Sequence, residues 1–285
     1  MEILIFKERI VKKVLIIFAM MLFSISFAET STNWDSEAAL KRVNTIGTKL
    51  LKANNINHDI KFTVSNTDDI NAYADINKEV HVYKGLLQYV DNDEELAGVI
   101  SHEMGHIING HCAKQGILNA GIASVANAVT TNEYANAIGQ TLASSKISRN
   151  DEFEADISGV DIMTKAGYNP LAMISLLNKI SGNYLDIFES HPSGEKRLMN
   201  VYNYIEYNYP SKIKAGFKSD SYTKALKVIT PNVEKRKASK WQTARYERQQ
   251  KKLLAKKEKR LKKMQGTNTV WDGYFATLQY LSTGE

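Results

Sequence analysis

Cysteine is almost absent from this chain of 285 residues, which contains only Cys112. A single cysteine cannot form a disulfide within the chain, so the fold must be held together by apolar packing. The fraction of apolar residues, 43%, is ordinary for a globular protein. Cys112 itself is interpreted as a small buried thiol.

Long apolar runs are also absent. The stretch Val14–Phe27 has 14 residues, whereas a helix needs about 20 residues to span a bilayer. Basic residues precede it, and Ser26 and Ala28 are the small residues that signal peptidase recognises. The pattern predicts a signal peptide over residues 1–28, with an uncleaved anchor as the alternative. No cysteine stands directly after the cleavage point, which argues against a lipid-anchored lipoprotein. We expect the mature chain to be exported, into the periplasm of a Gram-negative bacterium.

An excess of positive charge is confined to one segment. The whole chain has a net charge of +6, but Pro231–Met264 carries 14 Lys and Arg against 3 Glu, so the rest sums to −5. This break predicts a domain boundary near residue 215 and a basic, helical C-terminal extension over residues 216–285. Because an exported protein rarely meets nucleic acid, the extension is expected to contact an anionic membrane, lipopolysaccharide or an acidic partner. A solvated helix or disordered arm is the alternative.

The order of predicted elements is helix, small sheet, then helices. Asp35–Leu51 has apolar residues at helical spacing, residues 58–66 alternate like a strand, and residues 68–87 read as two short strands around an Asn-Lys turn. Helical spacing returns from Glu94, over Arg149–Ala166 and Pro170–Ile180, and after His191. Residues 113–147 are predicted to form loosely packed helix and loop. This order indicates an α+β fold, mostly helical with a small mixed sheet.

The stretch VISHEMGHIINGH, residues 99–111, contains three of the six histidines. His102 and His106 share one face of the expected helix, about 5–6 Å apart, where both rings can bind one Zn²⁺. Glu103 lies about 100° further round the helix, where it can reach a metal-bound water. This is the HExxH pattern, in which the carboxylate takes a proton from that water. Gly105 leaves the helix surface bare, so that substrate or another backbone can approach.

Histidines on a helix can also be purely structural, and five-residue motifs arise by chance. A catalytic zinc needs a third protein ligand. The extended form HExxHxxGxxH cannot supply it, because Asn109 and Cys112 occupy the positions of its Gly and His. The third ligand must therefore come from another part of the chain.

An acidic helix predicted within residues 148–170 supplies a candidate third ligand. Glu152 and Asp156 are four residues apart and share a face, whereas Glu154 points about 200° away from Glu152. Glu152 can ligate the metal while Asp156 accepts the ring N–H of a ligating histidine. Acids favour helix N-termini, which alone would explain Glu152 but not Asp156.

Five segments together resemble the HtpX and CAAX-prenyl-protease type of zinc endopeptidase, most closely its soluble periplasmic, BepA- and LoiP-like branch. They are NAYA (71–74), VHVYKGLL (80–87), DEELAGVISHEMGHIINGH (93–111), SRNDEFEADISGVDIMTKAGYNP (148–170) and SHPSGEKR (190–197). The resemblance implies a zincin-like metallopeptidase domain over residues 29–215. It also implies one Zn²⁺ held by His102, His106 and Glu152, with Glu103 as the general base and Asp156 supporting a ligand.

The resemblance extends to residues outside the ligand set. His191 would lie near the zinc and stabilise the oxyanion or block the closed site, unless it only begins a helix before a proline. Arg197 would pair with the acidic helix or contact the substrate or transition state. The strand near His81 would be the sheet edge to which an extended substrate adds. His111, five residues after His106, lies off the ligand face and is expected to support the centre or the fold.

The function expected from the sequence is that of a secreted zinc metalloendopeptidase. It would cleave unfolded or specific cell-envelope proteins in protein quality control, with protein or peptide substrates as partners and no nucleic acid. The alternative is a chaperone-like protein that binds clients in the same groove and rarely cuts. Both need the fold, but only the enzyme needs Glu103. A purely structural zinc site is disfavoured by the acidic third ligand.

Overall fold

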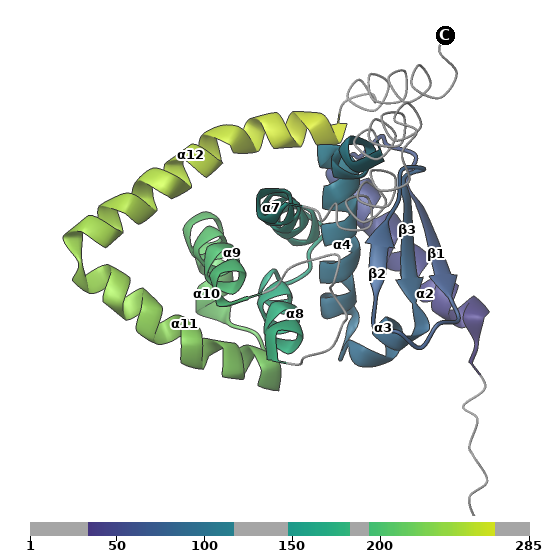
Figure 1. Cartoon of the computed structure of the whole chain (residues 1–285), viewed down its shortest axis with the longest axis horizontal. Helices are drawn as coiled ribbons and strands as arrows, with labels where there is room; N and C mark the ends of the chain where they lie inside the picture. Colours follow the sequence, from purple (N-terminus) through teal and green to yellow (C-terminus); the bar gives the residue numbers. More distant parts are fainter. Residues whose placement is uncertain (1–33, 117–147, 183–193, 266–285) are drawn as a thin grey trace, which may run out of the picture. The chain divides into compact units, whose positions relative to one another are not determined.

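The computed structural model describes residues 34–116, 148–182 and 194–265. All the elements described below belong to one compact unit that begins at Ser36. In chain order they are α2 (Ser36–Asn54), β1 (Lys61–Ser65), β2 (Ala72–Ala74), β3 (Glu79–Tyr83), α3 (Lys84–Tyr89), α4 (Asp93–Asn109), α7 (Arg149–Lys165), α8 (Leu171–Gly182), α9 (Glu195–Asn208), α10 (Pro210–Ala215), α11 (Asp220–Ala238) and α12 (Lys240–Gln265) (Figure 1). The predicted signal peptide and most of the segment 113–147 lie outside the described residues.

The sheet has three strands in the order β1–β3–β2. β3 pairs in parallel with β1 and antiparallel with β2. Phe62, Val80 and Val82 are buried on one face, because alternate side chains of a strand share a face, and α2 packs against β1. The turn between β2 and β3 includes Lys78 with a φ of 64°, at the predicted Asn-Lys turn. The mixed sheet among helices confirms the predicted α+β architecture.

β2 pairs with β3 along one edge, and its other edge faces away from the sheet. Asn71 accepts a hydrogen bond from the Tyr83 N–H at 3.0 Å. In an antiparallel pair the residues that exchange hydrogen bonds alternate, so the main-chain groups of Ala72 and Ala74 point away from β3. This outer edge is on the side of β2 that contacts α4.

His81 lies on β3, between the two other strands. The prediction that its strand forms the sheet edge is therefore wrong. The reason is that the NAYA segment pairs along the outer side of β3 and itself takes the edge position. At this edge Cys112 donates its thiol hydrogen to the Ala74 carbonyl, with 3.4 Å between sulfur and oxygen.

Helix α4 lies in the middle of the protein interior. It begins after Asn92, whose side chain accepts the N–H of Glu95, and ends at Gly110, which has the left-handed φ of 77° that favours glycine. Every residue from Glu95 to Asn109 is buried. Buried polar groups need partners, so the histidines and glutamates of α4 must be satisfied from neighbouring elements.

Helix α7 crosses α4 at very close range. Its first turn is fixed by a capping box, in which Ser148 and Asp151 each bond to the other's main chain. A Cβ added to Gly105 of α4 would lie 2.7 Å from the Ala155 carbonyl oxygen of α7, and one added to Gly159 of α7 would lie 3.0 Å from the His102 nitrogen. The bare surface predicted at Gly105 is thus filled by a second backbone.

A buried polar cluster ties the C-terminal helix to α7. Asp161 of α7 accepts hydrogen bonds from the Tyr204 hydroxyl of α9 at 2.8 Å and the Tyr209 hydroxyl at 2.6 Å. Arg260 of α12 donates to the Tyr204 hydroxyl at 2.8 Å, and Lys257 Nζ lies 3.1 Å from the Asp161 carboxylate. We call these five residues the Asp161 cluster.

Helices α11 and α12 meet at an elbow at Ser239, and α9 and α10 lie between the two arms in Figure 1. Helix α11 packs on α8 and α9, and α12 packs on α9 and α4. Both arms belong to the same compact unit as α4 and α7. Within the described residues, none of the helices combines the length and apolarity needed to cross a membrane.

Candidate metal centre

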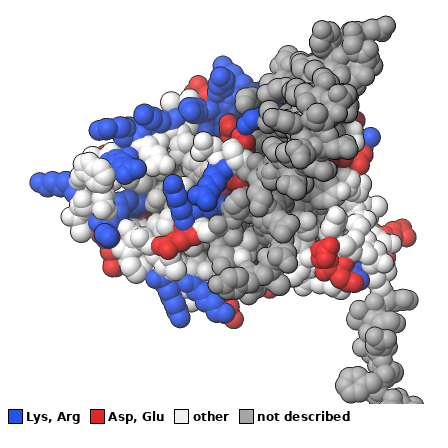
Figure 2. Space-filling view, viewed as in Figure 1, with Lys and Arg blue, Asp and Glu red and all other residues white. Residues whose placement is uncertain are grey.

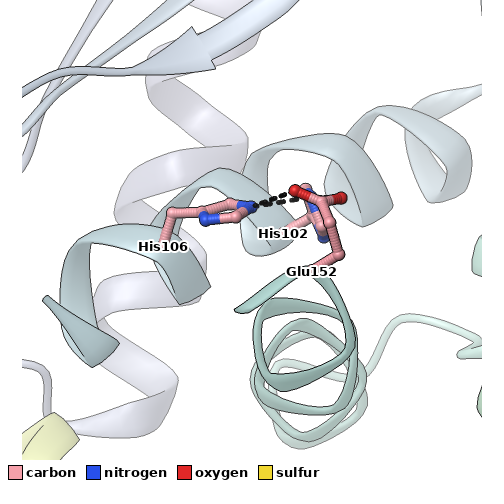
Figure 3. Close-up of side chains that lie close together, drawn as sticks. All are labelled: His102, His106 and Glu152. Carbon is pink, nitrogen blue, oxygen red and sulfur yellow. Dashed lines mark hydrogen bonds and ion pairs between the residues drawn. The ribbon is translucent and has the colours of Figure 1, made fainter. Parts of the chain in front are cut away.

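Three side chains from two helices converge in the interior (Figure 3). His102 and His106 come from α4 and Glu152 from the first turn of α7, and all three are buried. The two histidine Nε2 atoms are 3.1 Å apart. Oxygens of Glu152 lie 3.6 Å from His102 Nε2 and 3.4 Å from His106 Nε2. The three residues predicted as metal ligands are therefore brought together.

The spacing of these three donors fits a zinc ion. Ligand atoms about 2.0–2.1 Å from a tetrahedral zinc stand about 3.3 Å from one another. The observed separations of 3.1, 3.4 and 3.6 Å bracket that value. Two imidazoles and one carboxylate are also a donor set of catalytic zinc sites, which keep a fourth position open. The residues present thus suit the group that the sequence predicts.

The other ring nitrogen of His102 faces a carboxylate. His102 Nδ1 lies 3.0 Å from Asp156 Oδ1, the contact expected from the spacing of Glu152 and Asp156. Burial alone would raise the Asp156 pKa, but the charge and hydrogen bonds of Arg197, and then those of His102, hold that pKa below its usual value. Asp156 therefore remains an anionic acceptor that can fix the orientation of the His102 ring.

Arg197 lies inside this network. Its Nε and Nη2 each donate to one oxygen of Asp156 at 2.7 Å, and its Nη1 is 2.9 Å from Glu152. Burial lowers the Arg197 pKa, but the charge and hydrogen bond of Asp156 and the charges of Glu152 and Glu103 outweigh this and raise the pKa above its ordinary value. The geometry makes Arg197 a positioning residue for two carboxylates. A contact with substrate or transition state stays a prediction.

The second ring nitrogen of His106 also has a partner. Its Nδ1 lies 3.1 Å from Nδ1 of His111, and the other side of the His111 ring faces Asp151 at 3.7 Å and Glu154 at 3.6 Å. The helix period does not predict this contact, because α4 ends at Gly110 and the chain turns there. The sequence signal that could have found it is the glycine directly before His111.

The remaining predicted residues differ in how far the structure describes them. Glu103, beside His102 on α4, is buried at 1% exposure. Burial raises the pKa of the Cys112 thiol, and the charge of Glu103 adds to this effect.

His191 lies outside the described residues, so its relation to the centre stays a prediction. A second group of possible ligands, Asp75, Glu79 and His81, is half-buried on the sheet.

Comparison with known proteins places this site in a family. The model of "Peptidase family M48" matches residues 37–205, more than half of the chain. Metalloprotease LoiP from Escherichia coli is 29% identical over 177 residues, which are 56% of this chain and 68% of LoiP. Metalloprotease YcaL from the same organism is 29% identical over 169 residues, 54% of this chain and 66% of YcaL. A beta-barrel assembly-enhancing protease from Yersinia pestis is 27% identical over 186 residues, 56% of this chain and 38% of that protein.

These matches confirm the resemblance predicted from the motifs. The family match contains all three candidate ligands and the Arg197 network, whereas α11 and α12 lie beyond its end. The chain spans about two thirds of LoiP and YcaL and well under half of the beta-barrel assembly-enhancing protease. The chain belongs to peptidase family M48 and is a metalloendopeptidase.

Proposed function

We propose that this metalloendopeptidase depends on zinc, is exported to the periplasm and hydrolyses peptide bonds in unfolded or envelope proteins. The observation that carries the zinc assignment is the set of separations, 3.1–3.6 Å, among donor atoms of His102, His106 and Glu152. Glu103 stands next to one ligand on the same helix, which favours hydrolysis over a purely structural site.

The roles of the residues follow from these contacts. Zinc held by His102, His106 and Glu152 would supply Lewis acidity, which activates water and polarises a peptide carbonyl. Glu103 accepts the proton of the attacking water and passes it to the leaving amine. Asp156 and His111 keep the two histidine rings oriented from behind.

The outer edge of β2 is the proposed binding surface for an extended substrate. The main-chain groups of Ala72 and Ala74 are directed away from β3, toward the side on which α4 lies, and a substrate strand would displace the Cys112 thiol from the Ala74 carbonyl. A substrate strand can add to such an edge through main-chain hydrogen bonds, with little dependence on side chains. That mode suits an enzyme that acts on unfolded proteins of varied sequence. For His191 we retain the role in oxyanion stabilisation that the motif predicts.

Export and envelope substrates rest on the predicted signal peptide and on relatives. One relative is named for enhancing beta-barrel assembly; for this chain we propose a quality-control role of that general kind. The basic C-terminal helices would bring the enzyme to an anionic membrane surface or to lipopolysaccharide. The client-binding alternative lacks comparable support, since the matched relatives are named as proteases.

The test is metal analysis combined with digestion of unfolded casein by protein purified from the exported fraction. We expect about one zinc per chain, cleavage within casein, loss of cleavage on treatment with a chelator and recovery on addition of zinc. Zinc-loaded protein that binds casein without cutting it would support the client-binding alternative instead. Cleavage that persists after complete metal removal would contradict the zinc assignment.

A further inference from the structure

Helix α12 has two chemically different faces. The side chains directed toward the body include the buried Gln250 and Arg260 and the half-buried Tyr246 and Lys257. The opposite face is exposed along the whole helix and contains Trp241 and seven cations: Arg245, Arg248, Lys251, Lys252, Lys256, Lys259 and Lys262. We call these seven cations the basic ridge. By the helix period they all lie within roughly 80° of Trp241.

The inward contacts fix which way the basic ridge faces. Arg260 and Lys257 are held in the Asp161 cluster, and Arg236, near the end of α11, contacts Glu206 and stacks on the Tyr246 ring at 3.9 Å. Breaking a buried charge pair is strongly unfavourable. The cations of the two arms therefore divide into a few that anchor the helices and a larger number that are displayed.

The displayed charge is nearly uncompensated on its own helix. Residues 240–265 contain Glu247 and Glu258 as their acids, and the helix period places both more than about 80° from Trp241. Figure 2 shows Lys and Arg along α12 and around its elbow with α11. Like charges gathered on one face repel one another and are retained at a cost, which an anionic partner removes.

Trp241 distinguishes this face from an ordinary solvated one. Its side chain is 67% exposed in the first turn of α12, directly after the elbow. In the part of the chain that the structure describes, the exposed large apolar side chains are Leu40, Trp241 and Leu254, and two of these belong to α12. Arg245 lies 5.5 Å from the Trp241 ring. Tryptophan is enriched at the headgroup level of membranes, where cations also attract anionic lipids.

We propose that the basic ridge with Trp241 is a docking surface for an anionic phospholipid bilayer, with the indole inserted among the headgroups. The cations attract the surface, and the indole supplies an apolar contact that salt does not screen. The proposal names the surface and its anchoring residue. It rests on the proposed export, because that places the chain beside envelope membranes, but it does not depend on the metal centre.

An acidic protein or lipopolysaccharide is the competing partner. A protein interface of comparable strength needs a complementary pocket or an apolar centre, and the face of α12 offers one isolated indole on a convex helix. Cations spread over about five helical turns match a surface of closely spaced negative headgroups better than a few fixed carboxylates. The charge and shape therefore favour an anionic membrane surface over an acidic protein, and the vesicle test distinguishes phospholipid from lipopolysaccharide.

Vesicle sedimentation tests the electrostatic part. Protein from the exported fraction is mixed with vesicles of phosphatidylglycerol and phosphatidylcholine, or of phosphatidylcholine alone. We expect binding to the first, and replacement of Arg248, Lys252 and Lys259 by Gln should weaken it about 100-fold, or about fivefold for each cation removed. The matched control replaces three exposed lysines elsewhere, Lys41, Lys52 and Lys61, and should change the affinity only a few-fold.

Tryptophan fluorescence tests the insertion. Emission should shift to shorter wavelength on phosphatidylglycerol vesicles, and Trp241→Phe should abolish the shift while casein cleavage stays at the wild-type rate. Equal binding by the ridge and control triple variants would overturn the proposal. So would binding to lipopolysaccharide or an acidic protein without binding to phosphatidylglycerol. A failure of casein cleavage with normal vesicle binding would count only against the proposed zinc-dependent cleavage of unfolded proteins.

Discussion

Arg197 and Asp156 form a two-point contact, in which Nε and Nη2 of the guanidinium each donate to one carboxylate oxygen at 2.7 Å. Asp156 in turn faces His102, and the third nitrogen of Arg197 faces Glu152. One arginine from α9 thus holds two acids of α7 that act on the metal centre. Planar, paired contacts of this kind cannot be reproduced by lysine.

The first prediction concerns Arg197→Lys, which keeps the charge and removes the two-point geometry. We expect zinc affinity to fall about 10–100-fold, as for other residues that support ligands, with the helical circular dichroism preserved. Competition with a chelator of known affinity measures the change. Unaltered zinc affinity together with a lower kcat would instead indicate that Arg197 contacts the transition state.

The second prediction concerns His111, which lies 3.1 Å from the non-ligating nitrogen of His106. In His111→Ala that nitrogen loses its partner, so we expect zinc affinity to fall about 10-fold or more. His58→Ala, between α2 and β1, is the matched control and should bind zinc normally. If the two variants retained zinc equally well, His111 would be part of the fold rather than of the centre.

His111 shows why sequence reasoning reached some of the centre but not all of it. Residues on one helix, such as His102 and His106, are related by the helix period, so their convergence could be predicted from spacing alone. The position of His111 depends on a left-handed turn at Gly110. The edge position of β2 depends on a pairing between strands. Neither feature follows from a periodic pattern in the sequence, so both became visible only in the tertiary structure.

The Asp161 cluster was missed for a related reason. Asp161 looks like an ordinary acid on a helix, and Arg260 is one cation among many in the basic segment. Their contact joins positions 99 residues apart. Nothing in composition distinguishes an anchoring cation from a displayed one, because that difference arises only when the helix packs.

The third prediction uses two glycines of α4. A Cβ at Gly105 would meet the Ala155 carbonyl oxygen at 2.7 Å, whereas a Cβ at Gly98 would find its nearest atoms at an ordinary 3.9 Å. Gly105→Ala should force α4 and α7 apart, destabilise the fold by about 1–3 kcal/mol and weaken zinc binding. Gly98→Ala should be neutral or stabilise by about 0.5–1 kcal/mol, because alanine favours a helix. Urea unfolding and zinc titration of both variants measure the contrast. Equal stability and equal zinc affinity of the two variants would mean that neither property needs the close crossing of α4 and α7.

The fourth prediction concerns stability at alkaline pH. Burial, and then the charge of Asp161, raise the Tyr204 pKa above its ordinary value of 10. The unfolded chain therefore loses this proton near pH 10 while the folded chain keeps it. The stability that Tyr204 contributes is full below pH 10 and declines above it, by at most about 1.4 kcal/mol per pH unit.

Tyr204→Phe should accordingly be less stable than wild type by about 1–3 kcal/mol at pH 8, because Asp161 and Arg260 lose a buried partner. The difference should shrink as the pH rises above 10, because the Tyr204 contribution that the wild type then loses is absent from the variant. Urea unfolding at pH 8, 10 and 11 measures it. A constant difference across this range would show that Tyr204 does not remain protonated in the folded protein.

The last prediction separates the two carboxylates of the centre. Glu103→Gln should retain stoichiometric zinc and lose casein cleavage by about 10²–10⁴-fold, because glutamine has nearly the same shape but cannot accept the proton of water. Glu152→Gln should instead weaken zinc binding, because it removes the anionic donor that lies 3.4 Å from His106 Nε2 and leaves two histidines as ligands. Glu37→Gln, exposed on α2, is the control for loss of one negative charge. Metal analysis and digestion rates distinguish the two defects. If Glu103→Gln cleaved casein at the wild-type rate, Glu103 would not be the general base. If Glu103→Gln lost zinc as severely as Glu152→Gln, Glu103 would be a zinc ligand.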